Sequence, residues 1–248
     1  MISIKNKYAQ KNMIEAGRLL AEVFFDLQSY IKPGMTTFSI DLWIGRQLKN
    51  KNLMSAMRGY MGYKYVSCIS INDEVVHGIP HEARYIQPDD LVKVDVCASW
   101  NGYCADMARC FYFGNDEHVK KLIDVAMSSL DHGIAKSIST NHLSDISAAI
   151  QLTVEQYGFG VVRDFAGHGI GKKMHEDPEI LNYGAPGKGP LIQNGMAFAL
   201  EPMITLGNYE VFVMDDGWTV KTVDKSFAAH VEDTVLITEH GPSVITRL

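Results

Sequence analysis

Two aspartates, Asp95 and Asp106, stand in the otherwise largely apolar segment 91–113. We predict a β-hairpin there, because the central Asn-Gly dipeptide favours a two-residue type I′ turn. Such a turn sets three pairs across the hairpin: Trp100 with Tyr103, Asp95 with Ala108, and Cys97 with Asp106. The two aspartates are then diagonal neighbours on one face, and a cation between them would offset the cost of burying two carboxylates. The alternative is an edge hairpin with two solvated aspartates.

Three histidines stand in two glycine-containing motifs. His77 precedes Gly-Ile-Pro in NDEVVHGIP, which indicates a tight turn in which a lone histidine is more often structural than catalytic. His168 and His175 lie in FAGHGIGKKMHEDP, whose glycines exclude a regular helix and let the backbone approach another group closely. A nucleotide-binding glycine loop is disfavoured here, because no helix-forming run follows Gly171 before Pro178.

Two glutamates, Glu201 and Glu232, each interrupt a strand-like apolar run. A carboxylate in such a run is costly unless it is exposed, paired or bound to metal. Hard oxygen donors with one imidazole suit a pair of divalent ions, and four carboxylates balance two dications. The candidate ligands are Asp95, Asp106, His168, Glu201 and Glu232. A two-metal site polarises a carbonyl and lowers the pKa of a bridging water from about 15.7 towards about 7, so hydrolysis is the predicted chemistry.

The composition is that of a soluble globular protein, with 46% hydrophobic and 21% charged residues among 248. This length fits one large domain or two small ones. A net charge of -6 without a basic run argues against nucleic acid as a direct ligand. The start of the chain lacks the apolar core of a signal peptide, and no long apolar run follows, so we expect a cytoplasmic protein without a membrane partner. Its four cysteines show no C-x-x-C spacing and are expected to be free thiols.

The elements expected to position these residues are two helix pairs, each followed by strands. Helical spacing of apolar residues predicts helices over 7–30, 37–48, 120–137 and 143–157, the second capped by Thr37 or Ser39. Strand-like or extended segments are expected at 55–70, 161–165, 196–204, 209–214, 219–223 and 228–238, beside the hairpin. The repeated order suggests a pseudo-twofold α+β architecture whose halves, about 7–113 and 117–240, share one sheet and one core.

Five ordered motifs resemble those of the type I methionine aminopeptidases: NDEVVHGIP, KVDVCASWNGYCADMAR, GHGIGKKMHEDP, ALEPMI and VEDTVLIT. The resemblance covers nearly the whole chain and implies the α+β pita-bread fold, with pseudo-twofold related halves around a central antiparallel sheet. It implies a single catalytic domain over 1–248 that removes the initiator methionine from new polypeptides with a small second residue. The implied partners are nascent polypeptide N-termini and the ribosome, and the implied state is a monomer.

The resemblance also assigns the metal ligands. Asp106 and Glu232 would bridge both ions, Asp95 would bind one, and His168 and Glu201 would complete the other site. Co²⁺, Mn²⁺, Fe²⁺ and Zn²⁺ all suit an oxygen-rich site with one imidazole, so two divalent ions are expected without a choice among these metals.

Catalytic and substrate-binding roles follow from the same resemblance. Glu201 would act as general acid and base, His77 would contact the scissile amide nitrogen or stabilise the leaving group, and His175 would donate to the developing oxyanion. Apolar and aromatic walls suit an unbranched thioether. The implied substrate-binding residues are Tyr60, Tyr63, Cys68, His77, His175 and Trp218.

The chain departs from better-known members of that family around the pocket. Smaller, polar or aromatic residues are common where this chain has Met57, Met61 and Met174. His230 and Asp233 flank Glu232 where Gln and His are frequent. We expect these changes to alter the pocket and to leave the ligands alone. Cys97 falls on the metal-facing side of the hairpin, where we expect a thiol beside the ligands that biases metal choice or sensitivity to oxidation.

Two alternatives compete with this interpretation. A proline-specific or creatinase-like hydrolase of the same fold is hinted at by EDTVLIT, but such relatives usually carry a large N-terminal domain and only about 76 residues precede His77. A non-enzymatic family member acting as a binding module would typically lack metal ligands, whereas all five ligand positions are filled here.

Overall fold

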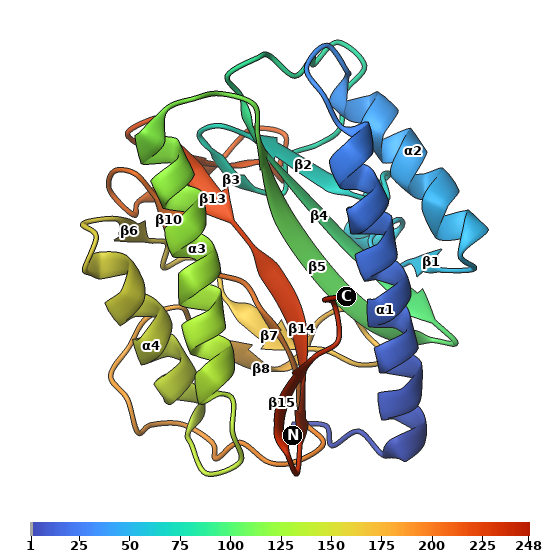
Figure 1. The fold of residues 1–248 in the computed structure, drawn as a ribbon, viewed down its shortest axis with the longest axis vertical. Helices are drawn as coiled ribbons and strands as arrows, with labels where there is room; N and C mark the ends of the chain where they lie inside the picture. The colour runs from blue at the N-terminus through green and yellow to red at the C-terminus, as the bar shows by residue number, and fades with distance from the viewer. Residues whose placement is uncertain (1) are drawn as a thin grey trace.

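Two helix pairs lie against the two halves of a curved antiparallel sheet, in a computed structural model that describes residues 2–248. Figure 1 shows α1 and α2 beside one half of the sheet and α3 and α4 beside the other. The bounds of the four helices are Lys7–Tyr30, Thr37–Asn50, Glu117–Lys136 and Leu143–Glu155. No helix among these residues is both long and apolar enough to cross a membrane.

The main sheet has nine strands in the order β1-β4-β5-β14-β9-β7-β8, with β2 also paired to β4 and β15 to β14. Its strands are β1 (Met54–Ser55), β2 (Cys68–Ile71), β4 (Leu91–Trp100), β5 (Tyr103–Tyr112), β7 (Gly167–Gly169), β8 (Glu176–Ile180), β9 (Ala197–Leu200), β14 (Glu232–Thr238) and β15 (Gly241–Val244). Two three-stranded sheets, β13-β10-β6 and β11-β12-β3, accompany it. Their strands are β3 (Glu74–Val76), β6 (Gly160–Val161), β10 (Met203–Thr205), β11 (Val211–Val213), β12 (Val220–Thr222) and β13 (Ala228–His230).

The hairpin β4–β5 has the predicted turn and register. Asn101 and Gly102 have φ values of 49° and 77°, as a type I′ turn requires. All three pairs expected from the sequence are present: Trp100 with Tyr103, Asp95 with Ala108, and Cys97 with Asp106. The turn is also tied to α1, because the Asn101 side chain donates to the Asn12 side chain at 3.0 Å.

Two hydrophobic clusters hold the helices on the sheet. One joins α1 and α2 to β2, β4 and β5, with Leu20 and Ile44 fully buried in it. The other joins α3 and α4 to β9 and β14 around the buried Phe198. The apolar surface buried in these two clusters, one on each half of the sheet, supplies most of the driving force for folding. The observed α+β architecture therefore agrees with the fold class expected from the sequence.

Several element boundaries differ from those expected. The cap of α2 is Thr36 and not Thr37 or Ser39, because the Thr36 hydroxyl oxygen accepts from Ser39 N at 3.0 Å. The helix expected from residue 120 begins at Glu117, because Asp116 caps it: the Asp116 side chain accepts a hydrogen bond from His118 N. The strand expected over 161–165 is only the two-residue β6.

Two long strands expected from apolar runs are each interrupted. The run 196–204 forms β9 and β10, separated at Glu201 and Pro202. The run 228–238 forms β13 and β14, separated at Val231, whose N–H donates to the Pro202 carbonyl oxygen at 3.4 Å. Proline lacks the N–H that a continuous sheet ladder needs. The two breaks lie at the same level of the main sheet, because Leu200 at the end of β9 pairs with Asp233 near the start of β14. These breaks place the two small strands β10 and β13 beside each other.

Asp41 of α2 holds the loop that leads into β2. It is 1% exposed, and its Oδ1 accepts from Val66 N, Ser67 N and the Ser67 hydroxyl at 2.9, 3.0 and 2.8 Å. The loop oxygen of Ser67 accepts in turn from the Tyr63 hydroxyl at 2.9 Å. One buried carboxylate oxygen thus organises the chain on both sides of the loop.

We expect Asp41→Ala to lower the free energy of unfolding by about 3 kcal/mol, because a buried donor left without its acceptor costs about 1–3 kcal/mol. Asp41→Asn keeps an acceptor oxygen and should lose less. Urea unfolding followed by circular dichroism measures both, and exposed Asp26→Ala on α1 is the matched control. Equal stabilities of the two alanine variants would contradict the assigned role.

Candidate metal centre

Five neighbouring strands of the main sheet, β4-β5-β14-β9-β7, each bring one of the expected ligands to the same place. In that order the ligands are Asp95, Asp106, Glu232, Glu201 and His168, with Glu201 directly after the end of β9. Strand pairing aligns them, since Glu232 lies opposite Ala108, and His168 and Thr234 both lie opposite Ala199. All five side chains line one cavity of about 260 Å³.

The donor atoms of this cluster are close enough to share an ion. One ligand atom from each of Asp106, His168 and Glu232 can be chosen so that all three lie within 4.8 Å of one another. Oε1 of Glu232 is buried and has no hydrogen-bond partner among the described residues. A buried carboxylate oxygen without a donor is unfavourable, and a cation would satisfy it. The donor set therefore fits a divalent metal.

Burial raises the pKa of all four carboxylates in the cluster, and neighbouring negative charges raise it further for three of them. Burial, with the charge of Asp106 next, raises the pKa of Asp95 well above its usual value, and burial raises the pKa of Asp106 to about 6. Burial and the neighbouring carboxylates likewise raise the pKa values of Glu201 and Glu232 well above the ordinary glutamate value. Negative charges this close favour either protons or cations, so the cluster is built to bind one or the other.

Backbone and side-chain contacts fix the ring of His168. Its Nδ1 lies 3.0 Å from the Gly169 carbonyl oxygen, which can only accept a hydrogen bond. Nδ1 therefore carries the proton and Nε2 presents its lone pair. That Nε2 lies 3.5 Å from Oε1 of Glu201, on the side of the cluster. Burial, and secondarily His175, lowers the pKa of His168 to about 4, which keeps the ring neutral and able to bind a metal.

Groups behind the ligands hold the strands β5 and β14 in place. The Thr234 hydroxyl accepts from Asp106 N at 2.8 Å and donates to the Asp106 carbonyl oxygen at 2.9 Å. Arg109 donates to the Glu232 carbonyl oxygen and to the buried Asp233 carboxylate, both at 2.6 Å. The Cys97 thiol donates to the Asp106 carboxylate, and burial raises the thiol's pKa well above its usual value. Cys97 is thus a protonated thiol beside the cluster.

The rest of the cavity wall is apolar and aromatic. Tyr63 and Trp218 contact each other with ring centroids 4.9 Å apart. Met57 is buried, whereas Met61 is 81% exposed at the rim. The wall is made of Met57, Tyr60, Met61, Tyr63, Cys68, Met174 and Trp218. The residues expected to bind a methionine side chain therefore line one cavity next to the ligands.

Two further histidines stand between this cavity and a larger cleft of about 870 Å³. His77 follows β3 with a φ of 59°, a left-handed conformation that is strained for a non-glycine residue and common at functional sites. Burial, and secondarily His175, lowers the pKa of His77 to about 4. His175 is exposed, its Nδ1 lies 3.0 Å from the Tyr60 hydroxyl, and its ring centroid lies 4.4 Å from that of His168.

Sequence reasoning missed several residues around the site. The larger cleft is also lined by Phe165 and by charged residues near the histidine motif, Asp164, Lys173, Asp177 and Glu179. Their position next to His168 and His175 in the sequence was the available signal.

A buried lysine on the hairpin was also missed. Lys93 of β4 is 1% exposed, its ammonium donates to the Asn72 carbonyl oxygen at 2.8 Å, and burial lowers its pKa to about 8. The alternation along the hairpin gave no sign that this lysine is buried.

Comparisons with known proteins agree with this geometry. Residues 11–239 match the model of metallopeptidase family M24. A methionine aminopeptidase of Clostridium acetobutylicum is 45% identical over 247 residues, which cover 99% of both chains. The structure of a methionine aminopeptidase from Thermotoga maritima has a TM-score of 0.98 at 40% identity and covers 100% of both chains.

A prolidase structure from Pyrococcus furiosus resembles the chain in fold alone, with a TM-score of 0.79 at 20% identity over 99% of this chain and 65% of that one. The expected pita-bread fold is therefore confirmed. Its curved sheet, two flanking helix pairs and central donor cluster are those described above. By family model, sequence and structure, the chain belongs to metallopeptidase family M24, in its methionine aminopeptidase group.

Proposed function

We propose that this chain removes the N-terminal methionine from new polypeptides whose second residue is small, in a metal-dependent hydrolysis. The observation that carries the proposal is the cavity of about 260 Å³ whose apolar and aromatic walls lead to the donor cluster. A flexible, unbranched thioether fits such walls, and the cluster lies where the carbonyl of that residue would be. Relatives that match the full length of the chain are named methionine aminopeptidases.

Two divalent ions are proposed, drawn from Co²⁺, Mn²⁺, Fe²⁺ and Zn²⁺. Asp106 and Glu232, whose strands pair directly, would bridge both ions, and Asp95 would hold one of them. His168 and Glu201 would complete the other site. Four carboxylates and a neutral imidazole balance two dications in charge. When bound, such ions polarise the substrate carbonyl and lower the pKa of a coordinated water.

The chain's own groups supply the remaining steps. Glu201, with its raised pKa, can accept a proton from the nucleophile and pass it on to the leaving amine. His77 faces both cavities, so a neutral imidazole there can donate to the scissile amide nitrogen or stabilise the leaving group. His175 is oriented by the Tyr60 hydroxyl and can donate from Nε2 to the developing oxyanion.

The larger cleft is proposed to hold the substrate beyond its first residue. It shares His77, His168, His175 and Glu201 with the methionine cavity, so a peptide bond can lie across these four residues. Phe165 and Met203 line the cleft, with the Phe165 ring centroid 5.6 Å from that of His77, and their bulk would favour small second residues. The cleft's openness to solvent suits a long polypeptide that continues away from the site.

We further propose that residues 1–248 act as one catalytic domain with two related halves, about 7–113 and 117–240. Each half contains a helix pair followed by strands of the shared sheet. The proposed partners are nascent polypeptide N-termini and the ribosome, with the protein acting as a monomer in the cytoplasm. The net charge of -6 supports the absence of a direct nucleic acid ligand.

Peptide hydrolysis tests the function directly. We expect purified protein supplied with Mn²⁺ or Co²⁺ to release methionine from Met-Ala-Ser and to leave Ala-Pro-Ala intact, because the thioether fills the aromatic cavity. A chelator should abolish release, and added metal should restore it. Cleavage of Ala-Pro-Ala alone would favour the proline-specific alternative, and metal binding without cleavage of either peptide would favour a binding module.

If Asp106 and Glu232 each bind both ions, a single substitution should weaken binding of two ions and not one. Asp106→Asn or Glu232→Gln should lower occupancy at both sites and remove activity, because one bridging carboxylate serves both ions. Isothermal titration calorimetry and elemental analysis give the number of ions bound. Asp26→Asn and Glu239→Gln, at exposed positions, are matched controls that should bind as the unmodified protein does. Two tightly bound ions in either bridging variant would rule out the assignment.

The proposed role of His77 predicts a separation of binding from chemistry. His77→Ala should retain both ions and lower kcat by about 100-fold or more, the usual contribution of a general acid or base, with little change in KM. Steady-state kinetics on Met-Ala-Ser, together with metal titration, measures both effects. Exposed His81→Ala, four residues away, is the control. A variant whose KM rises while kcat stays constant would place His77 in binding alone.

A further inference from the structure

We propose that His230 is a positioning residue for Glu201, donating from Nε2–H to Oε2 so that Oε1 alone faces the metal centre. The inference rests on the proposed function, because it concerns how a proposed ligand and proton acceptor is held. His230 lines neither the methionine cavity nor the larger cleft, so any effect on catalysis passes through another group.

The main chain around His230 is fixed on two sides. His230 is the last residue of β13 and pairs with Met203 of β10. Its carbonyl oxygen accepts from the Cys110 thiol of β5 at 3.4 Å. The residue is 2% exposed, so its ring is packed inside the protein and has little freedom to turn. A ring held in this way can act as a rigid hydrogen-bonding group.

Two imidazole nitrogens flank the carboxylate of Glu201, one at each oxygen. Nε2 of His168 lies 3.5 Å from Oε1, and Nε2 of His230 lies 3.4 Å from Oε2. His168 uses its Nδ1 proton on the Gly169 carbonyl oxygen, so its Nε2 offers a lone pair. The two histidines therefore need not play the same part, although they are placed alike around the glutamate.

The Nε2 atom of His230 is buried and has no hydrogen-bond partner within residues 2–248. Unpaired polar atoms of this kind are rare and unfavourable in folded proteins. The acceptor Oε2 of Glu201 lies 3.4 Å from it, and a movement of about 0.5 Å would turn this contact into an N–H···O bond of ordinary length. When Glu201 is ionised, as a metal ligand must be, a lone pair on Nε2 would instead face the carboxylate's own lone pairs and be repelled. The proton therefore belongs on Nε2.

This bond would make the two oxygens of Glu201 inequivalent. Oε2 is held by His230, whereas Oε1 lies on the side of His168 and the other ligands. Glu201 then binds with one oxygen in a fixed orientation, and the rotation of its long side chain is already restricted before an ion arrives. Groups that orient a ligand in this way typically change metal affinity or activity by about 10- to 100-fold when removed.

The first test is the tautomer of His230 in the metal-free protein and in its Zn²⁺ form. Nitrogen NMR of ¹⁵N-histidine-labelled protein distinguishes Nε2–H from Nδ1–H, and His230→Gln assigns the signal by its disappearance. We expect a proton on Nε2 in the Zn²⁺ form, in which Glu201 is ionised, and the metal-free spectrum shows whether it is already there before the ion binds. A proton on Nδ1 with a bare Nε2 would overturn the donor role, and a shift of the Nε2 signal that reports Zn²⁺ bound to it would replace the role with direct ligation.

The second test separates positioning from packing by two substitutions. His230→Leu fills the space without a donor, whereas His230→Gln keeps an N–H that can reach Glu201. We expect His230→Leu to weaken Mn²⁺ binding in calorimetry and to lower kcat on Met-Ala-Ser by about 10- to 100-fold, with KM little changed. His230→Gln should recover most of both losses. The visible spectrum of the Co²⁺ form should change in His230→Leu and return in His230→Gln.

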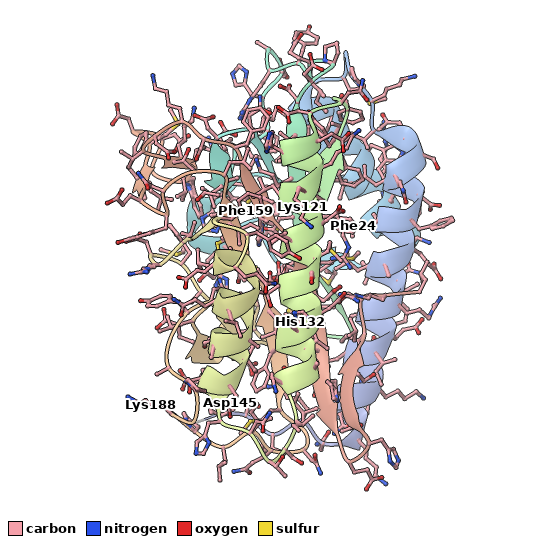
Figure 2. All side chains as sticks on the ribbon, turned by 60° about the vertical axis from the view of Figure 1, so that its left-hand side comes forward. Phe24, Lys121, His132, Asp145, Phe159 and Lys188 are labelled. Carbon is pink, nitrogen blue, oxygen red and sulfur yellow. The ribbon has the colours of Figure 1, made fainter. Side chains whose placement is uncertain are left out.

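Matched controls lie on α3, away from the site. His132 is exposed there, with its Nδ1 2.8 Å from the Thr153 hydroxyl of α4, and Figure 2 labels it on α3. His132→Leu and His132→Gln should leave metal binding, spectrum and kinetics unchanged. Thermal unfolding of every variant identifies any that fails to fold, in which case the tautomer measurement decides.

The outcomes keep the two proposals apart. Failure of the unmodified protein to release methionine contradicts the proposed function and leaves the tautomer test in force. The positioning role is contradicted if the unmodified protein is active and the folded His230→Leu variant has the same metal affinity, Co²⁺ spectrum and kcat. Equal losses in His230→Leu and His230→Gln would show that packing and not donation is what the imidazole supplies, and would also overturn it.

Discussion

Repulsion among four carboxylates in one cavity is the constraint that the rest of the molecule has to withstand. Burial raises the pKa values of Asp95, Asp106, Glu201 and Glu232, and the charges of neighbouring carboxylates raise those of all but Asp106 further. Without a cation, such a cluster tends to push its strands apart or to take up protons. The fold opposes this with two hydrophobic clusters, one on each half of the sheet, so that the ligand-bearing strands stay in register.

Two arginines lie behind the negatively charged cluster and bind the carboxylate next to it. Asp233, the neighbour of Glu232, points away from the cavity, is fully buried, and is bound by Arg109 at 2.6 Å and Arg247 at 2.7 Å. Arg109 also donates to the main-chain oxygen of Glu232, which ties the position of this ligand to an ion pair at the chain's C-terminal end. Removing one partner of such a buried pair is costly, so the position of Glu232 is set from outside the metal centre.

The sequence was sufficient for features that depend on local chemistry. The Asn-Gly turn and the two-residue period of a strand determine the register of Asp95 and Asp106, and both were predicted correctly. It was insufficient where distant contacts decide. The apolar runs holding Glu201 and Glu232 break where partner strands end, which no single run reveals. The burial of Lys93 depends likewise on a main-chain oxygen from another segment, that of Asn72. The cap of α2 is a local feature, and the prediction missed it by a single position, because Thr36 and not Thr37 accepts from the first turn.

The two strand interruptions that the sequence did not reveal lie at the site, and this has a physical reason. Regular strands present side chains at fixed, alternating positions, whereas a cluster of five donors needs positions that alternation does not provide. The interruption after β9 frees Glu201, the interruption after β13 brings His230 to it, and the left-handed backbone at His77 turns that ring toward both cavities. Each irregularity removes some of the hydrogen bonds between neighbouring strands. The long, regular hairpin β4–β5 keeps its own pairing complete, so it holds the metal centre rigid despite these three irregularities.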